Sequence, residues 1–291
     1  MYHTAQHTVA WLALLGVAFL GPSDAASSAA ENAPTSPARR RVATTGVLVI
    51  AHRGDSNVAP ENTLPAFASA VKAGADLVEL DYFHSSDGVP VVFHDDCLDR
   101  TTNACRLWGG TEIKLHTKKL AELRRLDAGR WFDAKFAGTP IPTLAESLEV
   151  IQAGSMTLIE RKDGDPATCV ALLKQKKLLD QVVVQAFDWE FLAGCRRLAP
   201  ELVLGALGGK ELTGKRLDEI AKTGATVIGW QDKYVDDAVI AAIHGRGWKA
   251  WVWTVDDPHR ARQLVQAGID GIITNSPAEI RKVVESHSRG N

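Results

Sequence analysis

Short apolar runs alternate with amphipathic segments from about residue 46 to the end of the chain. Eight runs are nearly continuous in apolar character, which is typical of strands covered on both faces. These are Val47–Ala51, Leu77–Asp81, Thr157–Arg161, Val182–Ala186, Val203–Ala206, Thr226–Gly229, Ala250–Thr254 and Gly271–Thr274. Helical patterns separate them, among them Leu64–Lys72, Thr143–Gln152, Leu217–Thr223 and Pro258–Ala267. Repeated β-α units of this number predict an α/β fold, a TIM (β/α)8 barrel, with a doubly wound open sheet as the alternative.

A ninth extended run, Val89–Phe93, does not fit this rhythm. Only Ser85-Ser86-Asp87-Gly88 separates it from the second strand, and a parallel crossover needs a dozen or more residues. Asp87-Gly88 is also a hairpin turn signal. The run is therefore predicted to return as a hairpin arm from the carboxyl end of the second strand, which would lift His94 over the barrel mouth.

Residues 95–142 then interrupt the alternation of strands and helices. The stretch contains Gly109-Gly110, a predicted short helix near Lys118–Leu126, and Ile141-Pro142. We expect a small insertion after the second strand that caps the mouth of the barrel.

The amino-terminal part has a different composition. An apolar run from Val9 to Leu20 is shorter than a spanning helix requires, and Ser23-Asp24-Ala25 offers small residues for cleavage. Residues 1–25 are interpreted as a secretory signal peptide, with an uncleaved anchor as the alternative, so a secreted or periplasmic protein is expected. Residues 26–44 are rich in Ala, Ser, Pro and Thr and are predicted to be a flexible linker before a barrel domain at 45–291.

Charge and cysteine content add two expectations. The formal net charge of -2 provides no global basic field for nucleic acid. The four cysteines, Cys97, Cys105, Cys169 and Cys195, allow three disulfide pairings in an exported protein. Cys169 with Cys195 is favoured because both fall in successive predicted helices, and four reduced thiols are the alternative. No feature of the sequence indicates an oligomeric state.

Ionisable residues gather at the ends of three predicted strands. His52 and Arg53 follow the first strand, and the period of two places Glu79 and Asp81 on one inward face of the second. Glu160 and Lys162 share a face on the third strand in the same way. Carboxylates that converge in this manner would repel one another without a cation, and an all-oxygen set suits Mg²⁺ or Ca²⁺.

Each of these residues alone could be structural, because a single inward carboxylate is usually an ion-pair partner. Their convergence from several strand ends favours function, since barrel enzymes build their sites at the carboxyl ends of the strands.

Several ordered motifs resemble the signature of the glycerophosphodiester phosphodiesterase family, of the bacterial, secreted type. The resemblance covers about residues 46–285. It rests on His52-Arg53-Gly54, Pro60-Glu61-Asn62-Thr63, Glu79-Leu80-Asp81, Asp87-Gly88 with His94-Asp95, Leu98-Asp99-Arg100-Thr101-Thr102-Asn103, Glu160 with Lys162, Gln185-Ala186-Phe187-Asp188, Trp253-Thr254-Val255 and Gly271-Ile272-Ile273-Thr274-Asn275.

The resemblance implies a barrel of the phosphatidylinositol-phosphodiesterase-like kind and metal-dependent hydrolysis of glycerophosphodiesters to glycerol 3-phosphate and an alcohol. The implied roles follow the matched positions: His52 and His94 as general acid and base, Glu79, Asp81 and Glu160 as ligands of one divalent cation, Arg53 and Lys162 as phosphate-binding cations, Glu61 as a support for Arg53, and Trp253 as a wall of the substrate pocket. The chain departs from the family at Arg161, where an aliphatic residue is usual, and at Tyr82-Phe83-His84.

Two other functions are weighed against this one. A lysophospholipase D or sphingomyelinase D-like activity on lysolipids would need membrane contact and an apolar rim, which Leu107, Trp108, Trp131 and Phe132 could supply. A non-catalytic barrel would be expected to lack at least one of the implied catalytic or metal-binding residues, and all of them are present.

Overall fold

The computed structural model describes Met1 and residues 36–290. The predicted signal peptide and most of the predicted linker lie outside this part of the chain. Within the described residues, no helix combines the length and the apolar character that crossing a membrane requires.

Eight parallel strands close into a barrel, as predicted. They are β1 (Leu48–Ala51), β2 (Leu77–His84), β4 (Met156–Arg161), β5 (Val182–Ala186), β6 (Val203–Gly208), β7 (Val227–Gln231), β8 (Lys249–Trp253) and β9 (Gly271–Thr274). Each strand pairs with the next in chain order, and the pairing of β1 with both β2 and β9 closes the ring. The open doubly wound sheet is thereby excluded.

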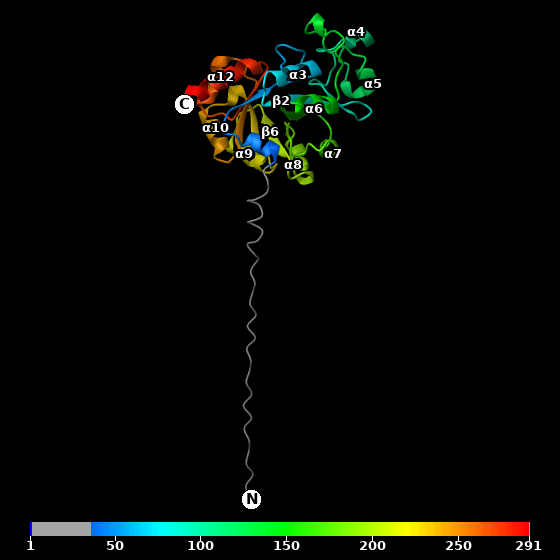
Figure 1. Cartoon of the computed structure of the whole chain (residues 1–291). Helices are drawn as coiled ribbons and strands as arrows, with labels where there is room; N and C mark the ends of the chain where they lie inside the picture. Colours follow the sequence, from blue (N-terminus) through cyan, green and yellow to red (C-terminus); the bar gives the residue numbers. More distant parts are fainter. Residues whose placement is uncertain (2–35, 291) are drawn as a thin grey trace. The chain divides into compact units, whose positions relative to one another are not determined.

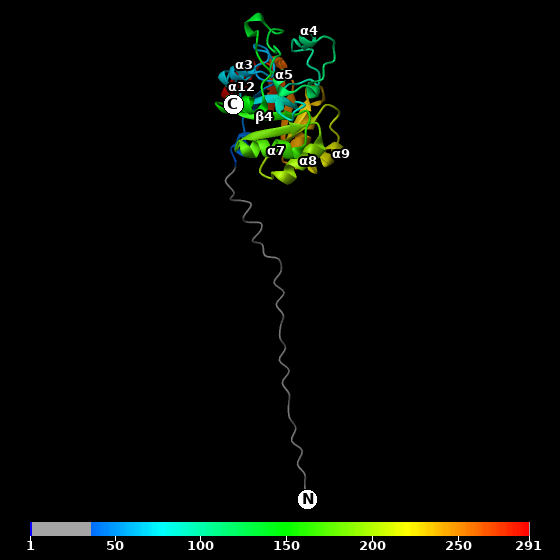
Figure 2. The same cartoon turned by 90° about the vertical axis from the view of Figure 1, so that its right-hand side faces the viewer.

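Helices surround the barrel and connect its strands (Figures 1 and 2). They are α3 (Leu64–Lys72), α6 (Leu144–Gln152), α7 (Pro166–Gln175), α8 (Trp189–Leu198), α9 (Gly214–Ala221), α10 (Asp237–His244), α11 (Pro258–Gln266) and α12 (Pro277–Gly290). Most begin at a side-chain cap. At α6, Thr143 accepts from the Glu146 amide while the Glu146 carboxylate accepts from the Thr143 amide, so two amides that the helix leaves unpaired find partners.

The predicted hairpin is confirmed. Strand β3 (Pro90–Val92) pairs antiparallel with the far end of β2. The amide of Phe93 then donates to the carbonyl of Asp81 at 3.0 Å, which continues the ladder to the residue before His94. The hairpin therefore holds His94 beside the carboxyl end of β2.

The insertion forms a small unit with its own core. It contains α4 (Ala104–Trp108), η1 (Leu115–Thr117), α5 (Leu120–Leu123) and η2 (Ala134–Phe136). Its apolar side chains, such as Leu98, Leu115 and Leu123, pack on Val91 and Phe93 of the hairpin. Figure 1 shows α4 and α5 together at one edge of the barrel. We expected a cap, but none of the residues that line the cavity at the mouth comes from 95–142.

The predicted flexible linker is wrong over its last residues. Helix α2 (Pro37–Val42) begins with Pro37 after Ser36, whose hydroxyl accepts from the Arg39 amide. Ala38 and Val42, one helical turn apart, are buried against side chains inside the amino-terminal end of the barrel. The linker was predicted from the average composition of residues 26–44, which is rich in Ala and Ser. Such an average does not detect two apolar residues spaced one helical turn apart. The folded unit accordingly begins at Ser36 rather than at residue 45.

The favoured disulfide is absent. All four cysteines are free thiols. Cys169 and Cys195 lie on neighbouring helices, as expected, and their thiols interact directly. Both are buried, and they pack as small apolar side chains.

Helix α2 generates a prediction on stability. Val42→Ala should lower the free energy of unfolding by about 2 kcal/mol, because it removes buried methyl groups from the floor of the barrel. Urea unfolding followed by circular dichroism measures the change. Thr45→Ala, at an exposed position three residues later, is the control and should leave the free energy unchanged. If the two variants were equally stable, α2 would not contribute to the folded core, and residues 37–42 would belong to the linker.

Candidate active site

A cavity of about 170 Å³ opens at the carboxyl ends of the barrel strands. The residues that line it come from seven of the eight barrel strands and from the hairpin, and they include seven of the nine predicted site residues. The lining residues are His52, Arg53, Glu79, His94, Glu160, Lys162, Gln185, Phe187, Leu207, Trp253 and Ile273. Asp81 and Glu61 lie directly behind this lining.

Three carboxylates form the centre of the site. Glu79 and Asp81 alternate along β2 and both point inward, and the register of the barrel pairs Asp81 with Glu160 on β4. Each residue offers an oxygen within 4.8 Å of the others, and all three side chains are buried. At an effective dielectric constant of 20, each pair of full charges at this distance would repel by about 3.5 kcal/mol.

Two cations oppose this repulsion. The ammonium of Lys162 contacts both Glu160 and the Oδ1 atom of Asp81, the latter at 3.0 Å. The Arg53 amide donates to Glu79 Oε2 at 2.8 Å, and its Nε lies 3.5 Å from Asp81 Oδ2. Glu79 Oε1, by contrast, is buried without a hydrogen-bond partner. Three negative charges therefore face two positive charges. The excess negative charge lies at Glu79, whose Oε1 atom has no partner.

The pKa values follow from this imbalance. Burial, together with Asp81 and Glu160, raises the pKa of Glu79 well above its usual value. Burial and Asp81 raise the pKa of Glu160 to about 7. Burial also acts on Asp81, but Lys162 and Arg53 outweigh it and lower the pKa of that carboxyl. An unpartnered buried oxygen beside two further carboxylates is a donor set that fits a hard divalent cation.

His52 is fixed by a chain of hydrogen bonds that reaches Asp256. The Asp256 carboxylate accepts from Asn275 Nδ2 at 2.7 Å, so Asn275 presents its Oδ1 to the other side. That oxygen accepts from the Ser56 hydroxyl and lies 2.7 Å from His52 Nδ1. His52 Nδ1 must therefore donate, which leaves Nε2 as the nitrogen available for proton transfer. Burial and, secondly, Arg53 lower the pKa of His52 to about 4.

His94 is oriented by a different network. Its Nδ1 donates to Asp95 at 2.5 Å, and Asp95 also accepts from Arg100 Nε at 2.6 Å. Arg100 donates to both carboxylate oxygens of Glu61, which in turn accepts from Arg53 at 2.8 Å. The pKa of His94 is lowered by burial, while Asp81 opposes that effect. The expected support of Arg53 by Glu61 is thus present, and it extends to His94.

Backbone geometry explains one residue in each of the motifs His52-Arg53-Gly54 and Pro60-Glu61-Asn62-Thr63. Gly54 has a φ of +86°, and a Cβ there would lie 2.7 Å from the backbone of Ala66 on α3. The close approach requires glycine. Asn62, also with a positive φ, donates from Nδ2 to Asp81 Oδ2 at 2.8 Å and accepts from the Asp81 amide. Asn62 therefore holds Asp81 directly, whereas Gly54 lets its segment pack closely against α3.

Aromatic side chains form one wall of the cavity. Trp253 donates from Nε1 to the Gly229 carbonyl at 3.1 Å and packs edge-on against Phe187 at 5.7 Å. Phe187 is half exposed. Trp251, on the same strand face, is fully buried among the inner side chains of the barrel. Arg161, one of the departures from the family motif, donates to Gly164 and Asp188 and does not line the cavity.

Sequence reasoning missed the residues that orient the histidines. Asn275 belongs to a motif that was noted without a role, and Asp256 was not singled out at all. Arg100 and Asp95 were in quoted motifs but were likewise without a role. The available signal for Asp256 was its position, three residues after Trp253 at the end of a barrel strand.

Comparisons with known proteins agree with this geometry. The model of the glycerophosphoryl diester phosphodiesterase family matches residues 52–279. A glycerophosphodiester phosphodiesterase of Caldanaerobacter subterraneus subsp. tengcongensis is 34% identical over 244 residues, which cover 81% of this chain and 97% of the relative. One from Bacillus subtilis is 33% identical, covering 83% of this chain and 87% of its own.

Solved structures give the same result. A phosphodiesterase of Oleispira antarctica, in complex with the product sn-glycerol-3-phosphate, has a TM-score of 0.76 and 31% identity, and the match covers 82% of this chain and 97% of that one. A glycerophosphodiester phosphodiesterase of Agrobacterium tumefaciens has a TM-score of 0.68 and 31% identity, with coverage of 81% and 99%.

The buried environment of His52 generates a prediction on its titration. The imidazole should stay neutral down to about pH 4, with the proton on Nδ1. Nitrogen-15 NMR of the labelled protein, assigned by comparison with His52→Gln, measures both the pKa and the tautomer. A midpoint at or above 6.5, the ordinary value for histidine, would contradict the prediction, as would a proton on Nε2 in the neutral form.

Proposed function

Because the chain belongs to the glycerophosphoryl diester phosphodiesterase family and is a glycerophosphodiester phosphodiesterase, we propose that it releases glycerol 3-phosphate by acid and base catalysis with two histidines and one divalent cation, Ca²⁺ or Mg²⁺. The observation that carries the proposal is the arrangement at the barrel mouth. Two histidines border the cavity there, and each uses its Nδ1 atom in a hydrogen bond. At the base of the same cavity lie three carboxylates whose negative charge is only partly neutralised.

His52 is proposed as the general base. With a pKa near 4 it is neutral at physiological pH, and its Nε2 can accept the proton of the attacking hydroxyl group, whether that group belongs to water or to the glycerol of the substrate. General bases of this kind contribute about 10²- to 10⁴-fold to a rate.

His94 is proposed as the general acid. It donates a proton from Nε2 to the oxygen of the leaving alcohol while Asp95 stabilises the imidazolium through Nδ1. The partial exposure of His94 supports this division of roles, because a proton can be resupplied from solvent after each turnover.

Glu79, Asp81 and Glu160 would hold the metal ion, which when bound supplies positive charge to the phosphoryl oxygens. Arg53 and Lys162 both line the cavity and add two cationic groups at its base. Charge that develops on the phosphoryl oxygens in the transition state would therefore meet preorganised cations. Trp253 would provide an apolar surface for the carbon skeleton of the substrate.

The cavity favours soluble diesters over lysolipids. The apolar insertion residues Leu107 and Trp131 are exposed but do not line the cavity, and Trp108 packs on the core of the insertion. Phe187 and Trp253 are the aromatic side chains that do line it. A site of about 170 Å³ suits a glycerol and a phosphate rather than an acyl chain.

The histidine roles lead to one prediction. His52→Ala and His94→Ala should each lower kcat by about 10²-fold or more, with circular dichroism unchanged. Release of glycerol 3-phosphate from glycerophosphocholine, glycerophosphoethanolamine and glycerophosphoglycerol measures turnover, and release of choline from lysophosphatidylcholine is the lipid comparison. His259→Ala, at an exposed position, is the control. Full activity in either site variant refutes its assigned role, and faster turnover of the lysolipid refutes the substrate class.

The carboxylate cluster leads to another prediction. Thorough chelation with EDTA should abolish turnover, and Ca²⁺ or Mg²⁺ should restore it, because Lys162 and Arg53 leave one of the three buried carboxylates without a balancing charge. The cation should also raise the melting temperature of the wild-type protein but not of Glu79→Gln, since a ligand that binds only the folded state stabilises it. Activity that survives chelation, or an equal thermal shift in the variant, would refute a metal site at these residues.

A further inference from the structure

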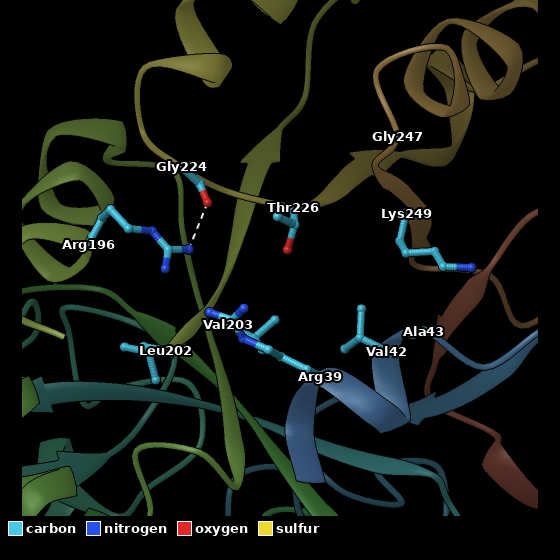
Figure 3. A pocket seen from close by; sticks show the side chains of 10 residues that line it. All are labelled: Arg39, Val42, Ala43, Arg196, Leu202, Val203, Gly224, Thr226, Gly247 and Lys249. Atoms are coloured by element: carbon cyan, nitrogen blue, oxygen red, sulfur yellow. Dashed lines mark hydrogen bonds between the residues drawn. The ribbon is translucent and has the colours of Figure 1, made fainter. Parts of the chain in front are cut away.

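A second cavity, of about 450 Å³, lies at the opposite end of the barrel (Figure 3). It is bounded by helix α2 and by residues at the amino-terminal starts of β6, β7 and β8, whereas the active site lies at the carboxyl ends. The residues that line it are Arg39, Val42, Ala43, Arg196, Leu202, Val203, Gly224, Thr226, Gly247 and Lys249. We refer to it as the floor cavity.

Two arginines of the floor cavity approach each other, and neither forms an ion pair among the described residues. Arg39 of α2 and Arg196 of α8 both donate to the carbonyl of Pro200, at 3.1 and 2.5 Å. Arg196 also donates to the Gly224 carbonyl at 2.7 Å. Within the described part of the chain, neither guanidinium forms an ion pair with a carboxylate. In Figure 3 the two side chains extend toward each other.

This proximity is electrostatically unfavourable. Burial, followed by the charge of Arg39, lowers the pKa of Arg196. A single carbonyl oxygen carries only a partial negative charge, so Pro200 cannot neutralise two guanidinium groups. Lys249 provides an internal comparison, because it lines the same cavity but is paired with Asp270 at 2.8 Å. Glu201 acts on Arg196 from a distance and offsets only part of this effect, so the floor cavity retains two guanidinium groups without an ion pair to any described carboxylate.

The remaining lining is apolar apart from one hydroxyl. Val42, Leu202 and Val203 present aliphatic side chains, and the Thr226 hydroxyl points toward the space between the arginines and Lys249 (Figure 3). A cavity of about 450 Å³ falls in the range of small-molecule sites. Its surface thus combines a dicationic end with an apolar wall.

We propose that the floor cavity is a binding site for an alkyl phosphate monoester, separate from the active site. A phosphate monoester carries up to two negative charges, which match Arg39 and Arg196, and its oxygens suit the planar donors of guanidinium groups. The Thr226 hydroxyl donates to a third oxygen, and the alkyl chain packs on Val42, Leu202 and Val203. A carboxylate would balance one arginine only.

Isothermal titration calorimetry with monomeric octyl phosphate tests the proposal. Octyl phosphate should bind the wild-type protein at least tenfold more tightly than inorganic phosphate, octanoate or octyl glucoside. Arg39→Gln and Arg196→Gln should each weaken binding at least tenfold. Arg197→Gln, an exposed neighbour on α8 that does not line the cavity, should bind as the wild type does.

Three further measurements separate the floor cavity from the mouth and from misfolding. Lys162→Gln, which alters the active site, should leave octyl phosphate binding at the floor unchanged, and Arg39→Gln should hydrolyse glycerophosphocholine at the wild-type rate. Arg39 is exposed, so its variant should retain the wild-type melting temperature even if Arg196→Gln does not. If Arg39→Gln bound octyl phosphate as tightly as the wild type does, the proposal would be overturned. If inorganic phosphate bound as tightly as octyl phosphate, the proposed packing of the alkyl chain on the apolar wall would be overturned.

Discussion

Three buried carboxylates at the mouth of the barrel are the constraint on which the site depends. Glu79 and Asp81 are 1% exposed and Glu160 is 8% exposed, so water screens their mutual repulsion only weakly. Lys162 and Arg53 neutralise part of the charge, and they do so mainly at Asp81 and Glu160. The remaining imbalance is concentrated at Glu79. A fold that keeps such a cluster needs a function for it, because apolar residues of similar size would fill the same space without this repulsion.

The two histidines are held by hydrogen-bond networks that differ in charge, and only the network of His94 reaches the carboxylate cluster. His94 is connected through Asp95, Arg100 and Glu61 to Arg53, a chain of ion pairs in which a charge at one end is felt at the other. His52 is connected through the neutral amide of Asn275 to Asp256. A neutral partner fixes orientation without stabilising an imidazolium strongly. The neutral partner suits a base that must stay neutral, whereas the Asp95 carboxylate opposes the burial that lowers the pKa of His94.

The barrel and most of the cluster could be predicted because they follow from local periodicity. Strand boundaries agree within two or three residues, and the period of two alone placed Glu79 and Asp81 on one face. Helix α2 was missed because it is short and buries only Ala38 and Val42. Asp256 was missed because its role depends on Asn275, which is close in space only after β8 and β9 have paired. The insertion was misjudged because its apolar residues fit a cap and a separate core equally well.

The two ends of the barrel carry opposite imbalances of charge, and they arise in different ways. At the mouth, the excess negative charge sits on strands whose register is determined by the whole barrel, so it cannot be relieved without altering the fold. At the floor, the excess positive charge comes from Arg39, on a six-residue helix that lies outside the β-α repeat. That helix already contributes Ala38 and Val42 to the core, and a neutral residue at position 39 would leave this contribution intact. The stability of α2 therefore does not require the arginine, and the proposed anion would give the approach of Arg39 to Arg196 a function beyond their shared contact with the Pro200 carbonyl.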